Sequence, residues 1–419
     1  MNGWSVVLLV LLFPYNAYNQ SNTRELLEAV KGTDSLVDAV LANSDKFRLQ
    51  FIITTINRSE GAKTTWKDYP MITGQYFFPA SVVKLPTAII TGEQLDSLNV
   101  GLNSRIVMNQ DVTCGSSRFV KRSVDNDLRF ANVLEEMLTI SDNDHFSLLF
   151  HFLGPRALNN GLMQRKILNT KIYSSYSGCE KRAAITTNSF TIYDEAGQKQ
   201  YFRPMQSLEL NYFEDRLKYS KQKLIGTSYY SGKKLIKEPF DFNFYHDYPL
   251  TDIHNTLKRL IFPQLFEQGQ AFDLSENTRD HLLRSMGKFP CEMVNPIYQD
   301  RTKYPDNYHK YSIFGEDSLG VKRERFRTIS KIGISYGFIT ETAYIIDFEQ
   351  QKDLLFTVSM YVNTDGVLND ARYDYENIAR PFLARFTQLI CDHLFVQPEI
   401  SNMSDAEINK YLKLFGMDH

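Results

Sequence analysis

The segment Phe78-Pro-Ala-Ser81-Val-Val-Lys84 places a hydroxyl and an amine three residues apart at the start of an apolar, helix-like run. In a helix this spacing puts Lys84 one turn from Ser81 on the same face. A lysine that is shielded from water loses its proton more easily and can act as a base for a neighbouring serine. The pair therefore predicts a self-activated serine nucleophile.

The spacing alone does not decide the matter, because Ser-x-x-Lys begins at four serines: Ser81, Ser220, Ser231 and Ser285. A serine before a helix is also a common N-cap. Only the first of the four leads into a long helix-like stretch, Leu85 to Leu98, and only the first has matching elements downstream.

Two further short elements follow in the chain. Ser141-Asp-Asn143 occurs once, directly after the helical pattern of Val133 to Ile140. Lys331-Ile-Gly333 is the only Lys-x-Gly and lies inside a strand-like segment. Each has an ordinary alternative, because Ser-Asp-Asn makes a good helix cap and Lys-x-Gly often marks a surface turn. Their order behind Ser81 favours a shared catalytic site.

Together the three elements resemble the SxxK, SDN and KTG signatures of the serine β-lactamase and penicillin-binding protein superfamily, closest to class A β-lactamases. The stretch from Ser141 through Leu153-Gly-Pro155 is similar to the helix that follows SDN in class A enzymes and to the LG and P residues after it. The likeness covers roughly residues 25 to 395 and is weakest at 170–250.

The resemblance implies a role for each matching side chain. Ser81 would attack an acyl carbon and form an acyl-enzyme, with Lys84 as its base. Ser141 would relay a proton to the leaving nitrogen. Asn143 would bind the substrate amide and orient Lys84, and Lys331 would supply positive charge beside Ser141.

The resemblance also implies an oxyanion hole. The backbone N–H groups of Ser81 and Ile334 would form it, with Gly333 between Lys331 and Ile334 as part of the substrate-binding strand. Ile332 stands where the family usually carries a Thr or Ser hydroxyl that helps bind the substrate carboxylate. The sequence thus departs from the family at one residue of the third element.

The base for deacylation is the second departure. Class A enzymes carry a Glu with an Asn four residues later in a loop after SDN, and no Glu-x-x-Leu-Asn occurs here. Glu180 lies in about the right stretch and is the candidate, with an ordinary surface glutamate as the alternative.

The elements that must position these residues follow from periodicity. Helices are expected at Asn22–Ala42, Phe146–Phe152, Asp252–Leu265, Ser275–Met286 and Tyr373–Leu394, and strands at Phe47–Asn57, Ile329–Ile346 and Asp353–Val362. The predicted fold class is α/β in an α+β arrangement, with an antiparallel sheet flanked by helices. The resemblance makes this a β-lactamase/transpeptidase-like fold.

The expected division has four parts. Residues 1–19 form a signal peptide, and 20–75 with 325–395 form the α/β sheet domain. Residues 76–324 form a mostly helical domain with an enlarged insertion around 170–250, and 396–419 form a helical C-terminal tail.

The charge balance of the chain bears on which partners it binds. With 47 basic and 49 acidic side chains, nothing favours a nucleic-acid partner. The apolar run Val6 to Phe13 is too short to span a bilayer and suits a secretory signal, with a buried N-terminal element as the alternative. We therefore expect export to the periplasm or the medium.

The eight histidines show no paired-ligand spacing, so neither a metal nor another cofactor is expected.

Three functions remain open. The first is a class A β-lactamase-like serine hydrolase. The second is a hydrolase of the same fold acting on another acyl compound, such as a D-alanyl peptide or an ester. The third is a penicillin-binding or sensor protein that does not turn over. The partner in each case is a β-lactam or a peptidoglycan-like acyl compound.

Overall fold

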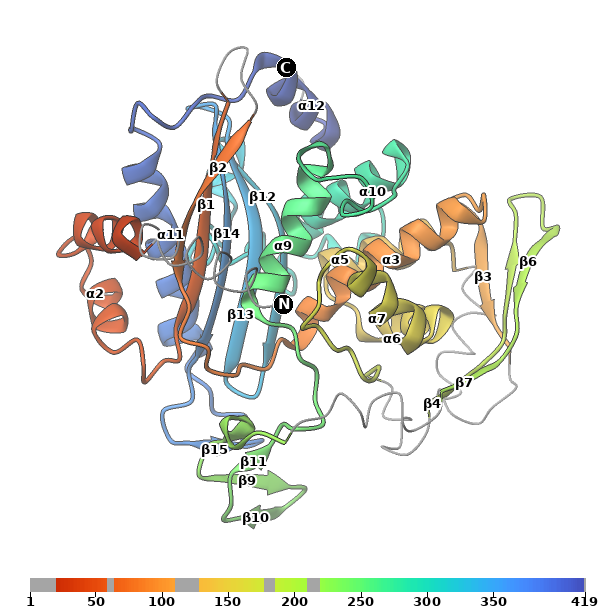
Figure 1. Ribbon diagram of the computed structural model, residues 1–419, viewed down its shortest axis with the longest axis horizontal. Helices are drawn as coiled ribbons and strands as arrows, with labels where there is room; N and C mark the ends of the chain where they lie inside the picture. The colour runs from red at the N-terminus through yellow and green to blue at the C-terminus, as the bar shows by residue number, and fades with distance from the viewer. Residues whose placement is uncertain (1–19, 59–63, 110–127, 177–184, 209–218, 418–419) are drawn as a thin grey trace, which may run out of the picture.

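The centre of the structure is a five-stranded antiparallel sheet with the strand order β12-β13-β14-β1-β2 (Figure 1). In this sheet β1, from the early part of the chain, pairs with β14, from its late part. The computed structural model describes residues 20–58, 64–109, 128–176, 185–208 and 219–417. The five strands are β1 (Gln50–Asn57), β2 (Thr65–Met71), β12 (Phe326–Ser335), β13 (Phe338–Asp347) and β14 (Lys352–Tyr361). β12 is an edge strand of this sheet, so one row of its backbone groups has no neighbouring strand.

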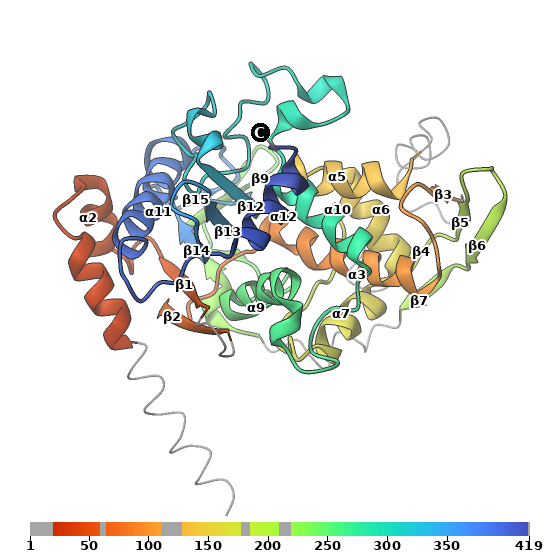
Figure 2. The same ribbon diagram turned by 90° about the horizontal axis from the view of Figure 1, so that it is seen from above.

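Helices cover both faces of the sheet (Figure 2). On one face lies α11 (Arg380–Leu394) with α2 (Ser35–Ala42), and on the other lie α9 (Leu250–Ile261) and α10 (Glu276–Gly287). All ten residues of β13 are buried, because alternate side chains enter a hydrophobic cluster on each face.

Beside the sheet, α3 is the central helix of a helical layer. α3 (Lys84–Ser97) packs against α5 (Phe130–Thr139), α6 (Asn143–Leu153), α7 (Pro155–Gln164) and α10. Every residue from Lys84 to Gly92 is buried, so this part of the helix is enclosed on every side. α3 therefore gives Ser81 and Lys84 a rigid support.

The segment expected as an insertion is built from short strands. β3 (Arg105–Met108), β5 (Phe190–Tyr193) and β6 (Lys199–Arg203) form one small sheet, and β4 (Ile185–Thr187) pairs with β7 (Gln206–Leu208). At the lower edge of Figure 1, β8 (Leu224–Ile225) pairs with β11 (Phe240–Asp241), and β9 (Ser228–Ser231) pairs with both β10 (Lys234–Ile236) and β15 (Val367–Leu368). The segment is thus tied to the chain beyond β14.

The remaining elements are short helices and a C-terminal helix. They are η1 (Ala80–Val83), η2 (Lys221–Lys223), η3 (Pro263–Leu265), η4 (Pro290–Glu292), η5 (Pro296–Tyr298), η6 (Val321–Glu324), η7 (Tyr375–Ala379) and α12 (Asp405–Phe415). α12 begins at a capping box, because Ser404 and Glu407 each bond the other's backbone N–H.

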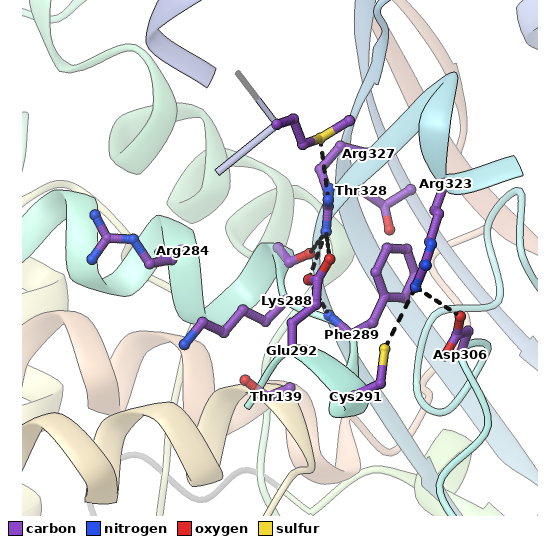
Figure 3. A network of polar contacts seen from close by, with 12 residues as sticks. Thr139, Arg284, Lys288, Phe289, Cys291, Glu292, Asp306, Arg323, Arg327 and Thr328 are labelled. Atoms are coloured by element: carbon purple, nitrogen blue, oxygen red, sulfur yellow. Dashed lines mark hydrogen bonds and ion pairs between the residues drawn. The ribbon is translucent and has the colours of Figure 1, made fainter. Parts of the chain in front are cut away.

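A buried arginine at the start of β12 connects α10, η4 and the C-terminal residues (Figure 3). Arg327 donates to Glu292 at 2.8 Å, and its guanidinium lies between the rings of Phe289 and Phe415. Gly287 permits this packing, since a Cβ there would lie 2.2 Å from the Phe415 ring. The network fixes the end of β12 that is remote from Lys331 and Gly333.

The sequence-based expectation of the fold class is confirmed, whereas several element bounds differ. The segment 329–346 is two strands, because Tyr336 and Gly337 adopt positive φ values of 56° and 83° and turn the chain into a hairpin. The helix expected over 22–42 is broken at Gly32, where φ is 80°, and restarts behind Asp34, which caps α2. The helix expected from Tyr373 begins as the π-helical turn η7 before α11.

Candidate active site

Ser81 lies on a strained turn that leads directly into α3. The turn η1 follows Pro79, and Ala80 adopts a φ of 44° although it is not a glycine. Such a conformation costs on the order of 1–3 kcal/mol and is maintained only by the surrounding structure. Ser81 is partly exposed between the buried residues Ala80 and Val82. Its hydroxyl makes no hydrogen bond to any residue that the structure describes.

Lys84 is fully buried and is held by the Ser141-Asp-Asn143 segment. Its Nζ donates to Ser141 O at 2.5 Å, Ser141 Oγ at 3.1 Å and Asn143 Oδ1 at 2.6 Å. Burial lowers the pKa of Lys84 to about 7, and the charge of Asp142 opposes this shift. At neutral pH a large fraction of the amine is therefore unprotonated, as a base for Ser81 requires.

Ser141 is the meeting point of two lysines. Lys331 Nζ donates to Ser141 Oγ at 2.8 Å, and Lys84 Nζ donates to the same oxygen at 3.1 Å. Lys331 is itself buried, and the nearby charges of Lys84 and Lys310 add to burial in holding its pKa well below the usual range. The Ser141 hydroxyl can therefore pass a proton between the lysines and a leaving group.

The helix-capping alternative for this segment applies to Asp142 alone. Asp142 Oδ1 accepts a hydrogen bond from His145 N at 2.8 Å and caps α6. Ser141, with a φ of 62°, and Asn143 are thereby left to face Lys84.

Gly333 brings the edge strand against the Ser81 turn. A Cβ at this position would lie 2.2 Å from Pro79 O, 2.8 Å from Ser81 N and 2.9 Å from Val82 N, so only glycine fits without a shift. Ile334, whose N–H is the expected second oxyanion donor, follows directly in β12. The two backbone segments expected to bind the oxyanion are thus adjacent.

Ile332 has no place in the site. Its side chain is buried in the hydrophobic cluster that also contains Phe314 and Phe382, on the face of β12 opposite to Lys331. The isoleucine is explained by core packing and adds no bulk beside Ser81. Glu180, the candidate for the deacylation base, lies outside the described residues.

The other three Ser-x-x-Lys matches have structural explanations. Ser220 Oγ accepts from Gln222 N at 3.2 Å as the cap of η2, and Ser285 Oγ donates to His281 O at 2.7 Å within α10. Ser231 is exposed at the end of β9.

Two residues near the lysines were not found from the sequence. The hydroxyl of Tyr176 donates to Ala80 O at 2.7 Å, and its ring centre lies 5.6 Å from Lys84 Nζ. His309 has a φ of 59°, and burial together with the charges of Lys331 and Lys84 holds its pKa well below the usual range. Neither belongs to a recognisable local pattern. No local sequence pattern predicts the positive φ of His309, and none marks Tyr176, which follows a stretch without strands.

The described ranges contain no group of three or more His, Cys, Asp and Glu side chains that could hold a metal ion. In those ranges no helix combines the length and apolar character needed to cross a bilayer.

The described residues thus bring the side chains of Lys84, Ser141, Asn143 and Lys331 together beside the Ser81 turn, in a fold of the expected class, an antiparallel sheet flanked by helices. Residues 36–201, which include Ser81, Lys84, Ser141 and Asn143, match the model of the beta-lactamase enzyme family. This match confirms over those residues the resemblance inferred from the three elements, while Lys331 and Gly333 lie beyond it. No curated protein matches the sequence.

Solved structures show the same general likeness. The TLA-3 extended-spectrum beta-lactamase is 14% identical with a TM-score of 0.47, covering 87% of this chain and 100% of that chain. A beta-lactamase from Burkholderia ambifaria is 14% identical with a TM-score of 0.48, covering 86% and 98%. One from Chitinophaga pinensis is 15% identical with a TM-score of 0.47, covering 89% and 99%. At such identities and TM-scores, neither activity nor substrate follows from these structures.

Proposed function

We propose that the protein is a serine hydrolase that forms an acyl-enzyme on Ser81 and hydrolyses the amide bond of β-lactam rings. The observation that carries the proposal is the Ser141 hydroxyl, which accepts hydrogen bonds from both Lys84 and Lys331. Two buried lysines on one hydroxyl are an unusual arrangement, because burial disfavours the charged form of each, and the nearness of Lys84 disfavours that of Lys331 further. Such an arrangement is characteristic of sites that move protons.

Ser81 Oγ forms a bond to the acyl carbon while its proton moves to neutral Lys84 Nζ. The ring C–N bond breaks, and the leaving nitrogen takes a proton from Ser141 Oγ, which is replenished by the protonated lysine. A substrate carboxylate beside Lys331 would favour the charged form of this amine, which would then stabilise negative charge that develops near Ser141. Attack of water then releases the acid and restores the Ser81 hydroxyl.

A second candidate is a protein of the same fold that keeps the acyl group. Among the residues that the structure describes, the one carboxylate whose charge acts on Lys84 is that of Asp142, and this side chain caps α6. Tyr176 occupies another side of the amine. Slow release of the acyl group would follow if no carboxylate reaches Lys84, and the natural substrate would then be a D-alanyl peptide or an ester.

One experiment separates the candidates. The protein is mixed with a chromogenic cephalosporin, colour is followed, and intact mass is measured at intervals. Continued colour without a lasting mass increase supports hydrolysis, whereas a stoichiometric adduct that persists supports the second candidate. If neither colour nor an adduct appears, β-lactams are excluded as substrates.

Two serine variants make this test specific. Ser81→Ala is expected to lose both signals. Ser231→Ala, which alters an exposed Ser-x-x-Lys serine on β9, is expected to behave as the unaltered protein. Export, expected from the apolar run Val6 to Phe13, stays a prediction.

A further inference from the structure

Tyr176 reaches the Ser81 turn from a segment that is fixed along its length. Lys171 N and Asp247 O lie 2.6 Å apart in a backbone bridge, and Ile172 N donates to Asn159 Oδ1 at 2.9 Å. Tyr176 N donates to Ser147 Oγ on α6 at 3.1 Å. The side chain of Tyr176 is therefore placed by α6, α7 and the chain near residue 247 together.

The two ends of the Tyr176 side chain contact two different parts of the site. Its hydroxyl donates to Ala80 O at 2.7 Å. Its ring centre lies 4.9 Å from that of Phe146, and both rings face Lys84 Nζ, at 5.6 Å for Tyr176 and 6.0 Å for Phe146. The hydroxyl thus acts on the backbone of the nucleophile turn and the ring on the amine.

The hydroxyl contact has a geometric consequence for Ser81. Ala80 O and Ser81 N–H belong to the same peptide unit, which is planar and holds the two groups in opposite directions. A donor that fixes Ala80 O therefore also fixes the direction of Ser81 N–H. The restraint matters because rotation of this peptide, which changes ψ of Ala80 and φ of Ser81, would turn the Ser81 N–H to a different direction.

Gly333 restrains the same peptide from the other side. The position of a Cβ on Gly333 lies 2.8 Å from Ser81 N, so β12 and Tyr176 hold the peptide between them. Loss of the Tyr176 hydroxyl would leave Ala80 O without this donor, and the peptide could rotate.

We propose that Tyr176 is a positioning residue, whose hydroxyl aims the Ser81 backbone N–H at the oxyanion of the substrate. The inference rests on the proposed acylation of Ser81 and adds a residue to which the family motifs assign no part. Because the N–H contacts negative charge that develops in the transition state, the effect falls on the acylation rate and not on binding of the intact substrate.

The test uses Tyr176→Phe, which keeps the ring beside Lys84 and removes the hydroxyl. Acylation by the chromogenic cephalosporin is followed over a range of concentrations. The rate at saturating substrate is expected to fall about ten- to a hundredfold, because a donor is misaligned without being deleted. The half-saturating concentration and the midpoint of the pH profile should stay unchanged, since the ring still covers Lys84.

Tyr248→Phe is the matched control. Tyr248 is buried whereas Tyr176 is half-buried, and the Tyr248 hydroxyl donates to Thr256 Oγ1 at 2.7 Å, away from the site. The Tyr248→Phe variant loses one buried hydrogen bond, and no effect on acylation is expected. A general loss of packing would slow both variants alike, whereas the proposed role slows Tyr176→Phe alone.

The outcomes separate this inference from the proposed function. If the unaltered protein forms no acyl-enzyme, the proposed function fails and this inference fails with it. If the unaltered protein is acylated and Tyr176→Phe is acylated at the same saturated rate, only the inference is overturned. It is also overturned if Tyr248→Phe is slowed equally or if the change lies in half-saturation.

Discussion

Replacing Gly333 by alanine tests the contact between β12 and the nucleophile turn. A Cβ would approach Pro79 O to 2.2 Å, Ser81 N to 2.8 Å and Val82 N to 2.9 Å, distances that real Cβ atoms essentially never show. All three neighbours are backbone atoms, so no side chain can rotate to make room. Either β12 or η1 must therefore move by about 1 Å, a displacement that can cost about a hundredfold in rate.

The movement separates the two expected oxyanion donors, the N–H groups of Ser81 and Ile334. A hundredfold loss corresponds to about 2.7 kcal/mol of transition-state stabilisation, which is close to the loss of one oxyanion donor. Overpacking should also lower the free energy of unfolding by about 1–3 kcal/mol. Binding of the intact substrate should change far less than the rate.

Stopped-flow acylation with the chromogenic cephalosporin measures the rate, and urea unfolding measures stability. Gly101→Ala is the control, because no atom lies within 4 Å of the added Cβ and φ there is not positive. The control should match the unaltered protein in both assays. An acylation rate of Gly333→Ala within about twofold of normal would show that the close approach of β12 has no part in the reaction.

Three further outcomes are expected. Because Lys84 acts as a neutral base and its pKa is lowered to about 7, acylation should rise with pH through about 7 and level off above it; a rise centred near pH 10 in a stopped-flow pH series would contradict this role. Ile332→Thr should lose about 1–3 kcal/mol in urea unfolding, since it buries a hydroxyl in the core, and should not speed acylation; faster acylation would place that side chain in the site. Glu292→Gln should cost about 3 kcal/mol or somewhat less, because Glu292 is partly exposed and the buried Arg327 loses its charged partner; an unchanged urea midpoint would argue against the network in Figure 3.

The sequence predicted those parts of the site that lie in short, contiguous patterns. Ser81 with Lys84 and Ser141 with Asn143 are each fixed by their spacing on one helix or helix start, and the structure joins them through Lys84 Nζ. The strand carrying Lys331 was expected correctly, although its hairpin turn at Tyr336 was not, because a positive φ at a tyrosine leaves no mark in composition.

What the sequence did not predict depends on contacts between distant residues. Tyr176 meets Ala80 across 96 positions of the chain, and β9 pairs with β15 far beyond it. Such pairings are set by tertiary packing and leave no local periodicity. The sequence also could not predict which face of β12 carries the side chain of Ile332. Because the strand is buried on both faces, its sequence does not distinguish the face toward the site from the face toward the core.

The central claim is that Ser81 carries the acyl group, and mapping the adduct tests this most directly. The protein is quenched in acid during reaction with a β-lactam and digested with trypsin. Cleavage after Lys67 and Lys84 yields the peptide Asp68–Lys84, in which Ser81 is the only serine. We predict the added mass on this peptide and its absence in Ser81→Ala. An adduct on another peptide, or equal labelling of Ser81→Ala, would contradict the assignment of the nucleophile.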